Sequence, residues 1–231
     1  MTASSLQAGV SAVNITPPVG CFLQGYSRGR PTIGIHRDLY AKALVLNDGT
    51  GPIGIVTLDL LGLDRTTVTV MHKAIASTVG IPANRIVLAC SHTHAGPHVQ
   101  GNNNNDPAYV DLLVHAVTQG LAVASQLMRP ARMGYAESIA NFAINRYLPK
   151  NGQKKFRPNP CGPVDHRVRV VSILDGAKPP PTDRPAPPPR AVFFVYSCHP
   201  TIMAQENLEI SPDFPGIAQA FVEQAYRGGP T

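Results

Sequence analysis

Three histidines follow apolar, strand-like segments and could together bind a metal ion. His92 and His94 lie in the segment ACSHTHAGPH, directly after the apolar run Arg85–Cys90, and His199 follows the apolar run Ala191–Ser197. If the extended backbone continues through the first segment, residues two apart point to the same side and the two imidazoles converge. Neutral imidazole is a favoured zinc ligand. A single histidine at the end of a strand is usually structural, but this arrangement of three favours a metal site.

Three other polar residues each have a functional and a structural interpretation. Asp59 lies in the apolar run IVTLDLLGL, where a lone carboxylate is costly; it could orient a metal-bound histidine, bind the metal itself, or accept a local hydrogen bond. Arg146, in NFAINRY, could stabilise an oxyanion as a fixed cation or lie in solvent. Asp213, in EISPDFPG, is interpreted as the cap of a terminal helix rather than as a catalytic group.

The apolar periodicity predicts an α/β fold that would position these side chains. Strands are expected at Gln7–Ile15, Ala41–Asn47, Ile53–Leu60, Arg85–Cys90, Arg132–Ala136, Val168–Leu174 and Ala191–Ser197. Helices are expected at Arg65–Val79, with Asp64 as N-cap and Gly80 after its end, at Tyr109–Met128 and at Pro215–Tyr226. The order indicates mixed β-sheet layers flanked by helices, with the active site at the C-terminal ends of strands. The proline-rich segment 178–190 is expected to be a surface loop of a hairpin rather than a domain linker.

The composition limits the classes of partner and location. The formal net charge is +6, but lysine and arginine form no run longer than Lys154–Lys155, so nucleic-acid binding is not expected. An anionic membrane surface remains compatible with this charge, and we expect peripheral membrane contact at most. The N-terminus MTASSLQAGVSAV has neither the basic nor the apolar region of a signal peptide, and no stretch of eighteen apolar residues predicts a membrane span. A cytoplasmic location is therefore expected by default.

Eight short segments occur in an order that points to a known family. They are AGVSAVNITPPVG, GIHRDLYAKALVLNDG, VTLDLLGL, CSHTHAGPH, INR, NPCGPVDHRV, YSCHPT and ISPDFPG, and together they span nearly the whole chain. In this order they resemble the neutral/alkaline, non-lysosomal ceramidase family, many members of which are secreted. The most specific part is the H-T-H-x-G-P element with the later strand-end histidine. The resemblance implies a zinc-dependent amidase that cleaves the N-acyl bond of ceramide-like lipids into a fatty acid and a sphingoid base.

The resemblance also implies roles for individual residues. His92 and His199 match the family's zinc ligands, and His94 and Arg146 match catalytic positions that contact the substrate or the reacting centre. The family completes its site with a later glutamate and tyrosine and with a serine from a G-D-x-[ST]-P-N-like segment, none of which occurs in these residues. We therefore expect residues 1–231 to be a single N-terminal catalytic, zinc-binding domain that is truncated at its C-terminus.

Two other functions stay open at the level of sequence. The chain could be a metal-dependent hydrolase of another small amide or ester, because a fold does not fix the chemistry that it supports. It could also be an inactive fragment that acts only as a binding module, which a failure to take up metal would favour. The expected partner is a lipid or another N-acyl amide substrate, and the sequence indicates no oligomeric state.

Overall fold

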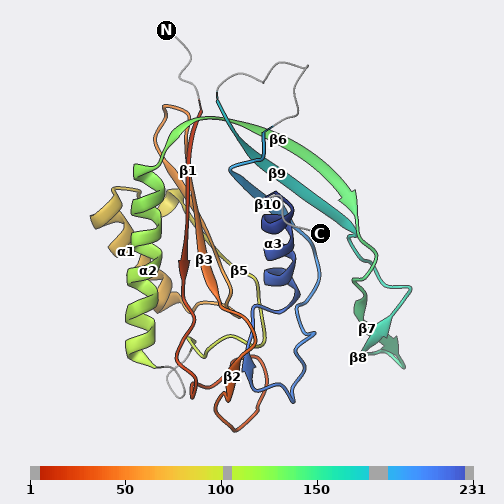
Figure 1. The fold of residues 1–231 in the computed structure, drawn as a ribbon. Helices are drawn as coiled ribbons and strands as arrows, with labels where there is room; N and C mark the ends of the chain where they lie inside the picture. Colours follow the sequence, from red (N-terminus) through yellow and green to blue (C-terminus); the bar gives the residue numbers. More distant parts are fainter. Residues whose placement is uncertain (1–5, 101–105, 177–186, 227–231) are drawn as a thin grey trace. The chain divides into compact units, whose positions relative to one another are not determined.

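The structure is a computed structural model that describes residues 6–100, 106–176 and 187–226 (Figure 1). The chain falls into two compact units, which are described separately below. The first unit is made of Met1–Arg132, Asp175–Pro188 and Pro200–Thr231, and the second of Met133–Leu174 and Pro189–His199. The expectation of a single domain over residues 1–231 stays a prediction.

A mixed sheet with the strand order β10-β9-β6-β1-β3-β4-β5 confirms the predicted α/β fold class. Neighbours β1, β3 and β4 are antiparallel, whereas β4 and β5 are parallel and are joined through a helix. The strands are β1 (Gln7–Asn14), β3 (Tyr40–Asn47), β4 (Ile53–Leu58), β5 (Ile86–Cys90), β6 (Arg129–Ile139), β9 (Arg167–Asp175) and β10 (Ala191–Val195). Val56 and Leu58 of β4 are buried, but Val87 of the outermost strand β5 is 55% exposed, so burial on both faces does not explain the apolar run of β5.

Helices cover both faces of the sheet in the first unit (Figure 1). α1 (Arg65–Val79) and α2 (Pro107–Gln126) lie on one face, and α3 (Asp213–Tyr226) lies on the other, where Lys42 of β3 forms a 2.6 Å ion pair with Glu223. The 3₁₀ helix η1 (Ala83–Arg85) leads into β5. The predicted ends of α1 are confirmed: the Asp64 carboxylate accepts a hydrogen bond from the N–H of Thr67, and Gly80 takes a left-handed φ of 75°.

The core of the first unit lies between α2 and the sheet. Leu113, Val117 and Leu121 of α2 are fully or almost fully buried. Gly9 of β1 allows the helix to approach closely, because a Cβ there would collide with the carbonyl oxygen of Ala124. Among the described residues, α2 is the one helix whose length and mean hydropathy of 1.2 would suffice to cross a membrane. Its buried face identifies it here as a core helix.

The second unit contains two hairpins and most of β6, which lies next to β9 in the sheet. β9 and β10 pair antiparallel, with Ala191 opposite Ile173, which confirms the predicted hairpin; residues 177–186 of its connection lie outside the described part. β7 (Asn145–Lys150) and β8 (Gln153–Asn159) form a hairpin that was not predicted. Asn151 and Gly152 make its two-residue turn with φ values of 52° and 73°, the positive values that such turns favour.

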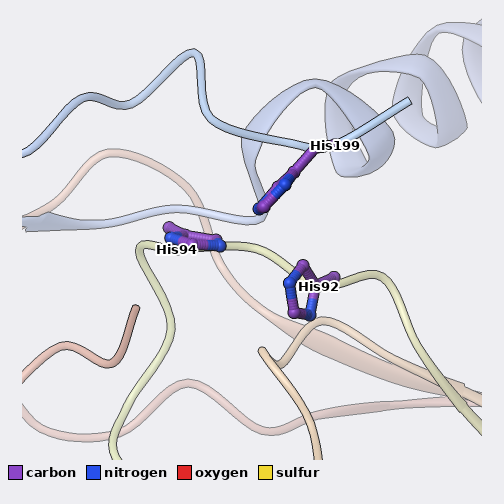
Figure 2. A group of neighbouring side chains, drawn as sticks. All are labelled: His92, His94 and His199. Carbon is purple, nitrogen blue, oxygen red and sulfur yellow. The ribbon is translucent and has the colours of Figure 1, made fainter. Parts of the chain in front are cut away.

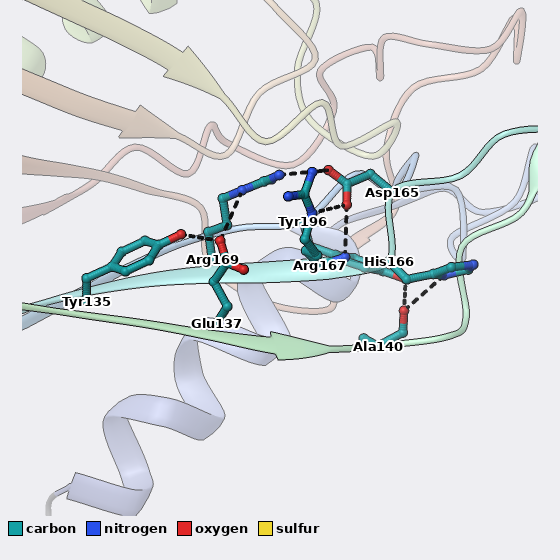
Figure 3. A network of polar contacts seen from close by, with 8 residues as sticks. All are labelled: Tyr135, Glu137, Ala140, Asp165, His166, Arg167, Arg169 and Tyr196. Atoms are coloured by element: carbon teal, nitrogen blue, oxygen red, sulfur yellow. Dashed lines mark hydrogen bonds and ion pairs between the residues drawn. The ribbon is translucent and has the colours of Figure 1, made fainter.

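Polar contacts join the strands of the second unit (Figure 3). The Asp165 carboxylate accepts hydrogen bonds from the guanidinium groups of Arg167 and Arg169, at 2.9 Å in each case. Arg169 also reaches Glu137, and the hydroxyl of Tyr135 donates to the same carboxylate. These side chains are partly or largely exposed, so the network adds cross-strand connections without forming an apolar core.

Candidate metal centre

The loop that follows β5 places His92 in an unusual backbone conformation. Its φ of 67° lies in the left-handed region, so the extended backbone assumed from the sequence does not continue through this residue. The His92 N–H donates to the Leu60 carbonyl at 2.9 Å, and Nδ1 of its ring lies 2.7 Å from the Leu61 carbonyl oxygen. These two contacts, to a segment about thirty residues away, hold the turned backbone in place. The rings of His92 and His94 nonetheless lie edge to face, with centroids 5.1 Å apart.

His94 is buried against a second loop of the first unit. The Tyr26 ring lies 4.8 Å from the His94 ring, and a Cβ on Gly25 would come within 2.5 Å of His94 Nδ1. Gly25 also has a φ of 105°, a value that side chains with a Cβ rarely adopt. Only glycine therefore fits at position 25 without displacing the imidazole.

The neighbouring backbone is fixed by hydrogen bonds to the segment before α3. The Thr93 hydroxyl donates to the Ser211 carbonyl at 2.8 Å, and the Ser211 N–H donates to the Ala95 carbonyl at 2.9 Å. This segment is aligned by a short parallel pair between β2 (Gly34–Ile35) and β11 (Glu209–Ile210). The histidine loop is therefore bound on two sides by elements distant in sequence.

The structure brings together the three histidines that the sequence singled out (Figure 2). One ring nitrogen each from His92, His94 and His199 lies within 4.8 Å of the others. His199 immediately precedes Pro200, where the chain re-enters the first unit. Donor atoms at this spacing can converge on one cation.

The donor set suits zinc better than magnesium or calcium. A carbonyl oxygen only accepts hydrogen bonds, so the Leu61 contact places the His92 proton on Nδ1 and the lone pair on Nε2. A carbonyl that orients the ring in this way is typical of metal-binding histidines. Imidazole nitrogens are preferred by zinc and similar transition metals, whereas magnesium and calcium prefer oxygen ligands. The three histidines therefore fit a zinc ion, with His92 and His199 as the predicted ligands.

Asp59 lies outside this group of side chains. Its carboxylate accepts a hydrogen bond from the Tyr40 N–H at 3.0 Å and contacts Gln219 of α3. Burial raises the pKa of Asp59 to about 6, against the opposing effect of the Tyr40 N–H and the Lys42 ammonium. The observed contacts match the local hydrogen-bond interpretation, and the ring proton of His92 is directed to Leu61 instead.

Arg146 and Asp213 also have defined surroundings. Arg146 lies on β7 in the second unit, with its guanidinium carbon 4.8 Å from the centre of the Phe156 ring. Its catalytic role stays a prediction. Asp213 begins α3 with a φ of 54°, and its carboxylate accepts hydrogen bonds from the N–H groups of Phe214 and Met203. A capping side chain accepts from the second or third residue of its helix, whereas Phe214 directly follows Asp213, so the capping role stays a prediction.

A pocket of about 660 Å³ is lined by residues that contact the first two histidines, although neither histidine lines it. Tyr26, which contacts the His94 ring, lines it, as does Leu61, whose carbonyl contacts His92. Volumes in this range accommodate small ligands. The glycine-containing loop that forms much of this pocket was missed in the sequence. The positive φ of Gly25 depends on tertiary contacts, and a G-Y-S tripeptide carries no strong local signal.

Comparison with known proteins places the chain in a family. The family model described as neutral/alkaline non-lysosomal ceramidase, N-terminal, matches residues 6–231. The chain belongs to this family. This ceramidase-family chain is similar to neutral ceramidase 2 of Arabidopsis thaliana (24% identity over 96% of the chain) and to neutral ceramidase of Oryza sativa subsp. japonica (23% over 96%).

A solved structure supports the fold of this ceramidase-family chain. The crystal structure of neutral ceramidase from Pseudomonas aeruginosa matches 96% of the chain with a TM-score of 0.75 at 19% identity. The chain spans 30% and 29% of the two plant relatives and 36% of the solved chain. The comparisons thus show the family and the fold of this part.

Proposed function

We propose that the chain forms the metal-binding part of a zinc-dependent amidase that cleaves the N-acyl bond of ceramide-like lipids. The observation that carries the proposal is the convergence of three histidine side chains, with the His92 tautomer set by the Leu61 carbonyl. Membership of the ceramidase family supports the choice of an N-acyl lipid as substrate.

Each residue of the proposed site has a distinct task. His92 and His199 hold the zinc ion, which supplies Lewis acidity that activates water at neutral pH and polarises an amide carbonyl. His94, packed against Tyr26 and Gly25, is positioned to move a proton or to donate a hydrogen bond to the developing oxyanion. Arg146 adds positive charge for that oxyanion, a role that rests on the family resemblance.

Zinc retention tests the ligand assignment directly. The chain is incubated with zinc and desalted, and the zinc-to-protein ratio is measured by plasma emission. We expect a ratio near one, falling to near zero in His92→Ala and in His199→Ala because each change removes a ligand. His115→Ala is the matched control, since this histidine is exposed on α2. A ratio that stays near one in His199→Ala shows that the ligand assignment is wrong.

Substrate tests separate the proposed amidase from the two alternatives. The zinc-loaded chain is incubated with a fluorescent ceramide and with a short N-acyl amide and ester. Release of fatty acid from ceramide, abolished by a chelator, is the expected result for a protein that carries these residues together with the family's later glutamate, tyrosine and serine. Hydrolysis of the short substrates alone favours another small amide or ester as substrate. A chain that takes up no zinc and releases no product acts at most as a binding module.

A further inference from the structure

The β7–β8 hairpin carries a concentration of positive charge, of which the proposed amidase chemistry uses only Arg146. Residues 145–159 contain Arg146, Lys150, Lys154, Lys155 and Arg157 and no acidic residue. The other 216 residues contain 15 basic and 14 acidic side chains. Nearly all the net charge of the chain therefore lies on one hairpin.

These cations are not neutralised within the described part of the chain. No Asp or Glu of residues 6–100, 106–176 and 187–226 forms an ion pair with any of the five. By contrast, Arg129, Arg167 and Arg169 each pair with a carboxylate. Lys150, Lys154, Lys155 and Arg157 are exposed to solvent. The hairpin thus presents an uncompensated positive surface.

Exposed aromatic side chains accompany the charge. Tyr147 and Phe156 are paired across the two strands, so they share one face of the hairpin, and their ring centroids lie 5.9 Å apart. They are 53% and 65% exposed, so both rings are accessible to solvent. Basic and aromatic residues together are the combination found at the surfaces of membranes, where rings enter the headgroup region.

We propose that the β7–β8 hairpin is a docking element for anionic lipid surfaces. Its cations bind lipid phosphate and carboxylate groups, while Tyr147 and Phe156 enter the interface. Nucleic acid is the less suitable partner, because base stacking needs open ring faces. One Phe156 face is already covered by the Arg146 guanidinium, and the Tyr147 ring packs against Phe156 at an interplanar angle of 76°. This inference goes beyond the proposed amidase activity, because vesicle binding requires neither zinc nor turnover.

Vesicle sedimentation tests the electrostatic part. The full chain is mixed with phosphatidylcholine vesicles with or without phosphatidylserine. We expect binding to the anionic vesicles that weakens as salt rises. Lys154→Gln/Lys155→Gln is expected to weaken this binding about 25-fold, or about fivefold for each cation removed. The matched control is Arg65→Gln/Lys73→Gln, which removes two exposed cations from α1 and is expected to change binding less than about twofold.

The aromatic part has its own variant and readout. Phe156→Ser is expected to weaken binding to both kinds of vesicle about tenfold, because it removes apolar area that enters the interface. Thermal melting confirms that each variant folds. Absence of binding to anionic vesicles overturns the proposal, as does an equal loss in the α1 control, which indicates a net-charge effect. Loss of binding to a single-stranded oligonucleotide with unchanged vesicle binding assigns the hairpin to nucleic acid instead.

Discussion

The first unit buries a continuous apolar core, whereas the second unit is joined largely by hydrogen bonds and exposed ion pairs. Leu58, Ile75 and Leu121 are among the fully buried side chains of the first unit. Among the described residues of the second unit, only Ala143 and Ile173 are buried apolar side chains. A core of that size provides little hydrophobic stabilisation.

The packed sheet of the first unit and the β7–β8 hairpin of the second accordingly suit different kinds of task. A metal ligand must be held within a fraction of an ångström, and the loop of His92 and His94 grows directly out of the packed sheet of the first unit. A surface that meets lipid headgroups tolerates looser positioning, and the β7–β8 hairpin is built on turn geometry and side-chain pairs. The following predictions test whether this contrast in construction is real.

The largest effect is expected from the core of the first unit. Leu121→Ala removes a fully buried side chain between α2 and the sheet, and we expect it to lower the free energy of unfolding by about 3 kcal/mol. Urea denaturation followed by circular dichroism measures the change. The contrast fails if this substitution destabilises the chain no more than a change in the exposed ion network.

Asp59 should make the first unit sensitive to pH. Its pKa of about 6 in the fold lies above the value of 3.8 expected for an unfolded chain. Its contribution to stability is therefore greatest below about pH 4 and is lost as the pH rises through about 6. Asp59→Asn keeps an oxygen that can accept from Tyr40 but does not ionise. The difference in unfolding free energy between the two proteins should change by on the order of 2 kcal/mol across this window. If the difference in unfolding free energy does not change with pH, burial does not raise the pKa of Asp59.

The glycine beside His94 tests how tightly the site is packed. Gly25→Ala should weaken zinc binding about tenfold, because the new Cβ displaces the His94 ring, which packs against the ring of the proposed ligand His92. Gly20→Ala is the control: its φ of 106° imposes the same backbone strain, but nothing lies within 4 Å of the added Cβ. Competition with a fluorescent zinc chelator measures the affinities. Equal affinities in the two variants show that His94 does not depend on this contact.

The smallest effect is expected in the second unit. Hydrogen bonds from Arg167 and Arg169 hold the pKa of Asp165 well below its usual range, so its stabilising effect is present at neutral pH and lost in acid. The stability contribution of Asp165 therefore changes with pH in the opposite direction to that of Asp59. Because the network is solvent-exposed, Asp165→Asn should lower Tm by at most a few degrees, and high salt should reduce the difference. A larger, salt-independent change shows that the network is structurally central.

Local signals in the sequence were sufficient for much of the fold. Asp64 and Gly80 defined both ends of α1, and the apolar runs of β4 and β5 indicated a parallel pair. The β7–β8 hairpin was missed although Asn151–Gly152 is a strong two-residue turn signal. Its strands carry lysines and arginines on both sides of that turn, which hides the apolar alternation expected of a strand.

The site was predictable in composition but not in geometry. The three histidines were predicted as a group because each follows a strand, and their ring nitrogens do lie close together. The strands that precede them, β5 and β10, are nevertheless the outermost strands at opposite ends of the sheet order. The turn at His92 could not be read from its neighbours, because its hydrogen-bond partners Leu60 and Leu61 are about thirty residues away. The contact between Gly25 and His94 spans an even longer separation. Such pairings leave no periodic pattern in a single sequence.

The left-handed backbone at His92 sets stability against function. A residue with a Cβ in this region costs about 1–2 kcal/mol, a penalty that glycine avoids. His92→Gly should therefore relax the loop while deleting a proposed ligand. A library selected only for heat resistance should accumulate glycine at position 92, whereas one selected for zinc retention should keep histidine. Selection for the most stable form of this loop would therefore remove the residue that is proposed to bind the metal.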